Sequence, residues 1–354
     1  MKTLPLLLLP LVLLGACGGG GPPAQSASTA AAVASASAKP AVSGKPAVSG
    51  ASVAVGTLAA VQTAAMSVAG SHWPEYVAQS KGFYQKEGLN VKTTVMNANA
   101  TVSGLVGKSL DISFTTAAGF VFAVDKGAGL LDIGAGIDRA PYKLMSPPDV
   151  KTVAALKGKT IGAASPVEPY TQVIREMLTK GGLDPQKDVH WTYGSSSNAR
   201  MQALLGGAIQ ATLVLPPEDG ELRSKGYNTL ASSLDYYPNL QLSLTAVRKD
   251  WAAQHQDVVR HYLAAQAEAS QWLNNPANKQ EAIGILAKVT KAQPSSAAEA
   301  YDAFVTQANA FPSNACVQDK GLQTLIDVLK SQGQVKNIQS MPSSQYVDGQ
   351  WCAH

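Results

Sequence analysis

The most constraining feature of this sequence is an alternation of strand-like and helix-like stretches that stops near Arg139 and then restarts. Before that point, LAAVQTA at 58–64 and DISFT at 111–115 each precede a helical pattern. After it, KTIGAA at 159–164 precedes PYTQVIREMLTK at 169–180, which has apolar residues on one helical face. Alternation with short connections predicts a parallel sheet covered by helices on both faces. Because the pattern occurs twice, we expect two α/β lobes.

From about Lys249 the character changes, and helical patterns dominate to the end of the chain. We therefore expect a helical C-terminal region after the second α/β unit. In an open α/β sheet, ligands bind outside the carboxyl ends of the strands, often at helix N-termini. Two facing lobes would place two such rims around one cleft.

The N-terminus carries a lysine, an apolar run from Leu4 to Leu14, and then small residues before Cys17. The run is shorter than the ~20 apolar residues that a membrane span needs, and the pattern predicts a signal peptide over residues 1–16. Leu14 to Cys17 reads LGAC, which resembles the bacterial lipobox and implies cleavage before a lipidated Cys17. The alternative is an ordinary cleaved signal with an incidental cysteine. We expect an exported protein, lipid-anchored on the periplasmic or extracytoplasmic face of the cell membrane.

Residues 17–56 are low in complexity and contain KPAVSG twice, at 39–44 and 45–50. Alanine, serine, glycine and proline cannot bury enough apolar surface to offset the entropy of ordering, which predicts a flexible linker. The remaining ~300 residues can form one large or two ordinary domains. Charged residues make up 15% of the chain and the net charge is +4, without a basic block. We therefore expect no nucleic-acid partner, and a monomer.

The chain has three cysteines, of which Cys17 is assigned to the lipid. Cys316 and Cys352 form an even pair in an exported protein, where disulfides persist, so we predict a disulfide between them. Neither has neighbouring cysteine or histidine ligands of the kind that a zinc site needs. No metal or cofactor is expected.

Five segments resemble, in order, a family of solute-binding proteins. They are PEYVAQSKGFYQKEGLNV, GKSLDISFTTAAGF, TVAALKGKTIGAA with MLTKGGLDPQKDVHWTYG, MQALLGGAIQATLVLPP and LTAVRKDW. The family serves ABC importers of the nitrate/sulfonate/taurine type and includes binders of thiamine-pyrimidine precursors. The resemblance implies a two-lobed periplasmic-binding-protein fold, an ABC permease as partner, and a small molecule held between the lobes.

By position, this resemblance puts the two crossover segments near Ile137–Pro141 and near Leu242–Val247. Lobe I would comprise residues 57–138 and 246–354, and lobe II residues 139–245.

On lobe I, the sequence favours five candidate ligand contacts. Trp73-Pro74 marks a helix start, because proline is tolerated in the first turn. The indole of Trp73 would offer the cleft a flat apolar wall and an N–H donor, with His72 beside it. Thr115 and Thr116 lie at a strand-to-helix turn and would present hydroxyls. Asp138 lies where the chain crosses between lobes, and contact with ligand and pairing across the hinge both remain open.

On lobe II, the candidates are Ser165, Ser195, Ser196 and Pro216, which follow predicted strands. Family members that bind oxyanions carry a Gly-Ser turn near Ser165, whose backbone N–H groups grip the anion. This chain reads ASPVEP there, and its prolines lack the N–H while Glu168 adds negative charge. We therefore expect a neutral or weakly charged organic ligand with a flat or aromatic ring, rather than a compact oxyanion.

Two functions other than delivery to an importer are compatible with this sequence. The first is a tethered receptor that presents its ligand to a sensor. The second is an enzyme on the same fold, related to thiamine-pyrimidine synthesis. That group carries a cysteine-rich iron motif which is absent here, and no catalytic motif stands out in the sequence. The interpretation is a binding protein and not an enzyme.

Overall fold

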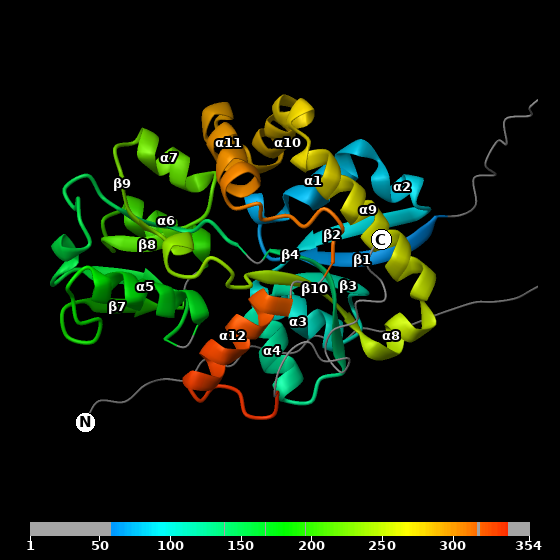
Figure 1. Cartoon of the computed structure of the whole chain (residues 1–354), viewed down its shortest axis with the longest axis horizontal. Helices are drawn as coiled ribbons and strands as arrows, with labels where there is room; N and C mark the ends of the chain where they lie inside the picture. The colour runs from blue at the N-terminus through cyan, green and yellow to red at the C-terminus, as the bar shows by residue number, and fades with distance from the viewer. Residues whose placement is uncertain (1–57, 138, 167, 195, 317–318, 339–354) are drawn as a thin grey trace, which may run out of the picture. The chain divides into compact units, whose positions relative to one another are not determined.

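The computed structural model describes residues 58–137, 139–166, 168–194, 196–316 and 319–338, which form two five-stranded sheets. The first sheet has the order β2-β1-β3-β10-β4 and the second the order β7-β6-β8-β5-β9 (Figure 1). The strands of the first sheet are β1 (Ala59–Ala65), β2 (Leu89–Val95), β3 (Ile112–Thr116), β4 (Leu130–Ile137) and β10 (Ser243–Arg248). Those of the second are β5 (Lys143–Ser146), β6 (Thr160–Ala163), β7 (His190–Tyr193), β8 (Ala211–Val214) and β9 (Asn228–Ser232).

Several sequence predictions fall outside the described residues. They are the signal peptide over 1–16, Cys17 and the linker to residue 56, together with Asp138, Ser195 and Cys352. None of the described helices is long and apolar enough to cross a membrane.

Each sheet contains one strand that runs against its neighbours, which corrects the prediction of purely parallel sheets. β1 is parallel to β2 and β3, whereas β10 is antiparallel to β3 and β4. In the second sheet β6 is parallel to β7 and β8, whereas β5 is antiparallel to β8 and β9. β5 and β10 are each the first strand after the chain changes sheets. Their direction therefore reflects where the chain enters and not a helical crossover within the sheet.

The chain passes between the sheets twice, after Ile137 at the end of β4 and after Ser232 at the end of β9. The first segment agrees with the predicted position near Ile137–Pro141. The second prediction, Leu242–Val247, was placed too late in the sequence, because those residues are almost entirely β10, which is buried at Ser243 to Val247. A strand that is buried on both faces, as β10 is from Ser243 to Val247, lacks the alternation that marks a strand with a solvated face.

Helices cover the first sheet on both faces, as Figure 1 shows, with α1, α2 and α9 on one side and α3 and α4 on the other. Their bounds are α1 (Trp73–Lys81), α2 (Phe83–Lys86), α3 (Ala98–Val106) and α4 (Ala117–Asp125). The helix that begins at Trp73 ends before Gly82, whose φ of 74° favours glycine, and α2 follows directly. A short 3₁₀ turn, η1 (Gly70–His72), precedes α1.

The second sheet carries α5 (Pro169–Lys180), α6 (Ser197–Leu205) and α7 (Glu218–Ser224). Consecutive residues of β8 divide between two apolar clusters: Leu213 belongs to the main cluster with α5, and Val214 to a smaller one with Leu204 and Leu222. Because successive strand side chains point to opposite faces, this places α5 on one face and α6 and α7 on the other.

The C-terminal region is helical, as predicted. It comprises α8 (Lys249–Gln254), α9 (Gln256–Asn274), α10 (Lys279–Thr290), α11 (Pro294–Tyr301), a π-helical segment (Asp302–Gln307) and α12 (Asp319–Ser331). α9 and α10 pack on α1, whereas α11 contacts α7 and α12 contacts α5 of the other lobe. Arg223 of α7 bonds Asp219 at 2.7 Å and also Glu299 of α11, so an ion pair joins the lobes there.

Cys316 is disulfide-bonded. Its predicted partner, Cys352, lies outside the described residues, so the pairing itself stays a prediction. The backbone before Cys316 lies tightly against β4: a side chain at Gly134 would come within 2.1 Å of the Ala315 carbonyl oxygen. Gly134 also has a φ of 123°, so only glycine suits this approach.

Candidate ligand-binding site

The predicted contacts follow the carboxyl ends of strands in both sheets. His72 and Trp73 come after β1, Thr115 and Thr116 end β3, Ser165 follows β6, Ser196 follows β7, and Pro216 follows β8. This is the edge at which open α/β sheets bind ligands.

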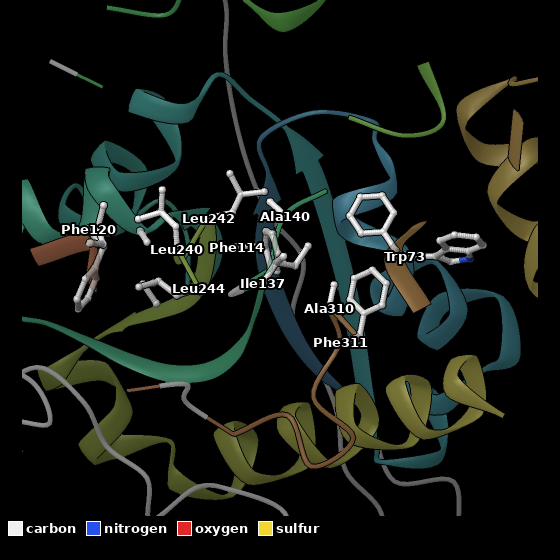
Figure 2. Packing of buried hydrophobic residues seen from close by; sticks show 14 of the residues in the cluster. Trp73, Phe114, Phe120, Ile137, Ala140, Leu240, Leu242, Leu244, Ala310 and Phe311 are labelled. Carbon is white, nitrogen blue, oxygen red and sulfur yellow. The ribbon is translucent and has the colours of Figure 1, made fainter. Parts of the chain in front are cut away.

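Trp73 does not form the apolar wall expected at the rim. Its side chain is fully buried, its indole N–H donates to the Ala282 carbonyl at 3.2 Å, and its ring meets Tyr301 edge-on at 5.9 Å. Figure 2 shows it among the helices of lobe I. The prediction was wrong because α10 and α11, which are far away in the sequence, cover the start of α1.

His72 is buried in contact with Phe114, with ring centroids 4.5 Å apart, and is 1% exposed. Neither ring nitrogen has a hydrogen-bond partner among the described residues. Nδ1 lies 3.7 Å from Oε2 of Glu75, whose other oxygen accepts a hydrogen bond from Thr93 at 2.5 Å. A buried imidazole without partners is unusual, since burying a polar group without a hydrogen bond costs free energy.

A small cavity adjoins His72. It has a volume of about 10 Å³, close to the room that one water molecule needs. Its polar lining comes from Ser71, His72, Glu75, Gln266 and Ser270. Phe114, Ile137 and Phe311 line the apolar side and lie close together in Figure 2. Gln266 and Ser270 belong to α9, and no local signal in the sequence connects them with a turn almost 200 residues earlier.

The two threonines are engaged in internal hydrogen bonds. Thr115 is fully buried and its hydroxyl lies 2.7 Å from that of Thr101. Thr116 is the N-cap of α4 and accepts from the Gly119 N–H at 3.1 Å. The plain capping role therefore describes Thr116, and Thr115 serves the packing of α3 on β3.

On lobe II, Ser165 is half-buried and Ser196 is exposed. Ser196 is the N-cap of α6, accepting from the Ala199 N–H at 3.2 Å. Glu168 is the N-cap of α5 and accepts from the Thr171 N–H at 3.0 Å. Burial raises the pKa of Glu168, although the N–H groups of Tyr170 and Thr171 and the charge of Arg200 each lower it.

Pro216 is buried where the lobes meet. A side chain added at Gly70 would come within 2.7 Å of its carbonyl oxygen. Glu218 follows as the first residue of α7, and burial raises its pKa to about 7. Its Oε2 atom is buried and has no hydrogen-bond partner in the described part of the chain.

Two tyrosines that the sequence analysis missed join the crossing segments. Tyr142 ends the first crossing, and its ring packs on that of Tyr170 with centroids 4.6 Å apart. The Tyr170 hydroxyl donates to the Leu240 carbonyl of the second crossing at 3.1 Å. Burial raises the pKa of Tyr142. The negative charges of Glu168 and Glu218 raise it further, and the positive charge of Arg200 lowers it. The charges of both carboxylates therefore act on this ring pair, which stands where the lobes join.

Among the described residues, no three histidine, cysteine, aspartate or glutamate side chains gather as metal ligands would. The arrangement offers instead aromatic faces, carboxylates and one imidazole. Such groups hold an organic molecule by stacking and hydrogen bonding.

Comparison with known proteins identifies the family. A family model described as "NMT1/THI5 like" matches residues 69–279. The chain belongs to the NMT1/THI5-like family. The match begins at the turn before His72 and extends over both lobes, and it confirms the resemblance predicted from the sequence. The "Putative binding protein YtlA" of Bacillus subtilis (strain 168) is 23% identical over 214 residues, which is 58% of this chain and 64% of that protein. The chain thus spans less than two thirds of this relative.

Solved structures of similar fold confirm the two-lobed architecture. The alkanesulfonate-binding protein SsuA from Xanthomonas axonopodis pv. citri superposes with a TM-score of 0.64 at 19% identity, covering 82% of this chain and 98% of that one. The periplasmic nitrate-binding protein NrtA from Synechocystis PCC 6803 gives 0.67 at 16% identity, covering 83% and 87%. The desulfurization enzyme DSZB gives 0.65 at 14% identity, covering 83% and 97%. At these identities the likeness establishes the fold alone, and the fold serves binding proteins and an enzyme.

Proposed function

We propose that this protein is an extracytoplasmic solute-binding lipoprotein that captures a small organic molecule between its lobes and delivers it to an ABC importer. The observation that carries the proposal is the junction itself. Two crossing segments join the two sheets there, the ring of Tyr142 packs on that of Tyr170, and the charges of Glu168, Glu218 and Arg200 act on Tyr142. The printed names of SsuA and NrtA describe binding proteins, which supports the same function for this chain.

The ligand we propose is organic and flat rather than a compact oxyanion. Trp73 is fully buried, but the ring pair Tyr142–Tyr170 offers an aromatic surface where the two crossing segments meet. The carboxylates of Glu168 and Glu218 and the guanidinium of Arg200 all act on the Tyr142 ring. A buried oxyanion needs charge-assisted donors, and the two carboxylates outnumber the one arginine that acts on this ring.

Thermal-shift screening of the exported, purified protein tests this function. The panel comprises sulfonates, nitrate, aromatic acids, pyrimidines, flavins and amides. We expect at least one organic compound to raise the melting temperature, and small-angle X-ray scattering to detect closure of the lobes in its presence. Turnover of any bound compound would instead favour an enzyme, as for DSZB.

The importer is proposed over a sensor as the partner because the printed names of the similar proteins refer to transport and solute binding. Genes for a permease and an ATPase beside this one would support delivery. A sensor kinase gene in their place would favour a tethered receptor.

Lipid anchoring has its own test, motivated by LGAC at residues 14–17. The Cys17→Ser variant removes the thiol that would receive the lipid, so we expect release from the membrane or retention of the unprocessed signal. Membrane fractionation and mass determination of the N-terminus measure the outcome. A variant that is cleaved normally and stays membrane-bound would contradict the anchor.

A further inference from the structure

Two buried polar groups at the lobe junction have no hydrogen-bond partner in the part of the chain that the structure describes. They are the imidazole of His72 on lobe I and the Oε2 atom of Glu218 on lobe II. A buried polar atom without a partner carries the cost of its desolvation and gains no hydrogen bond in return. Two of them at one junction point to a ligand that supplies the missing hydrogen bonds.

Both groups lie around the same turn. Gly70, two residues before His72, abuts the carbonyl of Pro216, two residues before Glu218. Tyr76 connects the two sides: its ring lies 6.3 Å from that of His72, and its hydroxyl accepts from the Ala69 N–H at 3.1 Å. Burial raises the pKa of Tyr76, and the charges of Glu75 and Glu218 add to this effect. His72 and Glu218 therefore lie on opposite sides of the close contact between Gly70 and Pro216, with Tyr76 beside both.

The room beside His72 limits what can enter. The cavity of about 10 Å³ accommodates one water-sized group and no ring. All residues that line this cavity belong to lobe I, so a ligand held between the lobes would place only one water-sized group of its head there.

The chemistry of the head follows from the two groups it must satisfy. An ionised carboxylate only accepts hydrogen bonds, so the atom facing Glu218 must donate. A neutral imidazole has one donor and one acceptor nitrogen and suits either kind of partner. We propose, as a refinement that rests on the proposed function, that the ligand carries an N–H-bearing head group, an amidine, amide or primary amine, which donates to Glu218 and hydrogen-bonds to His72.

The surrounding charges agree with this assignment. Asp219 and Glu221 on the same helix add negative charge near Glu218, and Arg223 binds the carboxylate of Asp219 at 2.7 Å. On other elements, the charge of Glu218 raises the pKa values of Tyr76 in α1 and of Tyr142 in the first crossing. The charge of Glu168 also raises the pKa of Tyr142, and that of Arg200 lowers it. The pKa of Glu218 near 7 leaves the carboxylate ionised above neutrality. It then favours a positively charged or neutral donor and repels an anion.

Three compounds of one shape test the proposal. Benzamidine, benzamide and benzoate share a flat ring and a planar head. The head of benzamidine is a cationic donor, that of benzamide is neutral and both donates and accepts, and that of benzoate is an anionic acceptor. Isothermal titration calorimetry on the full-length, exported protein at pH 8 measures each affinity. We expect benzamidine and benzamide to bind at least ~10-fold more tightly than benzoate, the scale of one charge-assisted hydrogen bond.

Two variants assign the effect to the carboxylate. Glu218→Gln keeps the side-chain shape but offers a donor as well as an acceptor, so we expect the preference for benzamidine over benzoate to fall ~10-fold or more. Glu281→Gln makes the same change at an exposed glutamate of α10 that pairs with Lys81, and we expect it to leave all three affinities unchanged. Circular dichroism of each variant verifies folding, and an equal loss of all three ligands would signal misfolding rather than lost recognition. In that case Glu218→Asp, which retains the acceptor, must keep the preference.

The outcomes separate this inference from the proposed function. Benzoate, nitrate or methanesulfonate binding as tightly as benzamidine, with closure of the lobes, overturns the N–H head group and leaves the solute-binding function standing. A preference that survives Glu218→Gln also overturns the assignment. Failure of all these compounds to bind at millimolar concentration counts against both.

Discussion

The two rims of the lobe junction use their polar residues differently. On lobe I, the indole N–H of Trp73 and the hydroxyls of Thr115 and Thr116 are all satisfied inside the lobe. On lobe II, the ring of Tyr142 and the carboxylates of Glu168 and Glu218 stay close enough to influence one another. Lobe I thus uses these side chains for its own packing and contributes the imidazole of His72 to the junction, whereas lobe II contributes the carboxylates of Glu168 and Glu218.

The difference follows from how the chain is distributed. Lobe I receives the C-terminal helices, and α9 and α10 pack on α1 and bury the start of that helix. The described residues of lobe II form three α-helices, α5, α6 and α7, and β7 alternates between exposed and partly buried residues. A rim that is covered by additional helices uses its side chains for packing, whereas a rim that is less covered can keep them for a ligand.

The strongest test of this contrast is Trp73→Ala. Because the ring is fully buried, its removal leaves a cavity, and we expect the free energy of unfolding to fall by about 3–5 kcal/mol. Urea denaturation measures the loss. The affinity of the folded protein for its ligand should change little.

Trp191→Ala on β7 is the matched control, since its indole is only partly buried although it also donates to a backbone carbonyl, that of Pro185, at 2.8 Å. We expect a clearly smaller loss of stability there. If Trp73→Ala left stability intact and abolished binding, the framework role of lobe I would be refuted.

A second test concerns Asp132, a buried acid of lobe I. Asp132 of β4 is 2% exposed, and burial raises its pKa to about 8, with the Gly134 N–H opposing and the charge of Asp319 adding. Its folded pKa exceeds the unfolded value, so the native state holds an extra proton between about pH 4 and 8. Stability contributed by the protonated form is therefore lost as the pH rises through this window.

Asp132→Asn retains an acceptor for the Gly134 N–H, which Asp132 accepts at 3.0 Å, and removes the ionisation. We expect the variant to gain ~1–3 kcal/mol over the wild type at pH 9 and almost nothing near pH 4. Denaturation at a series of pH values measures the gain. A difference independent of pH would contradict burial of the charge, and altered ligand affinity would contradict a purely structural role in lobe I.

These residues also indicate what the sequence could and could not predict. The two lobes and most strands and helices were predictable, because hydrophobic periodicity and glycine stops are local signals. β5 and the direction of β10 were not, since both depend on where the chain enters a sheet from the other lobe. The position of Pro216 after β8 was correctly inferred from order alone.

The site was less predictable than the fold. Trp73 and Thr115 carry the residue types of a ligand contact, and only the folded chain reveals that α10 and Thr101 satisfy them. Conversely, nothing in the sequence indicated that Tyr142, next to the predicted crossing, would belong to the site. Gln266 and Ser270 of α9 line the His72 cavity. Contacts between residues so far apart in sequence leave no local pattern.

The pH dependence of binding tests whether the charge of Glu218 on lobe II controls ligand affinity. The pKa of Glu218 is about 7, so its carboxylate gains charge as the pH rises from 6 to 8. Affinity for benzamidine, which stays cationic in this range, should rise by up to ~10-fold and level off above pH 8. Benzamide should respond less. Calorimetry across this range measures both, and Glu218→Gln should abolish the rise; a rise that persists would assign it to another group.

The smallest expected effect concerns the ion pair that joins the lobes. Arg223 is held by Asp219 of its own helix and also meets Glu299 of α11, whose side chain is 53% exposed. An exposed ion pair stabilises by only about 0.2–1 kcal/mol. If the Arg223–Glu299 pair favours closure of the lobes, Glu299→Gln should weaken benzamidine binding by at most ~5-fold. The effect should vanish in high salt, which screens exposed charges.

Glu281→Gln removes a comparable pair, Lys81–Glu281, that lies within lobe I, and should leave affinity unchanged. Equal effects of the two substitutions would mean that the Arg223 contact stabilises the fold generally and does not favour closure of one lobe on the other.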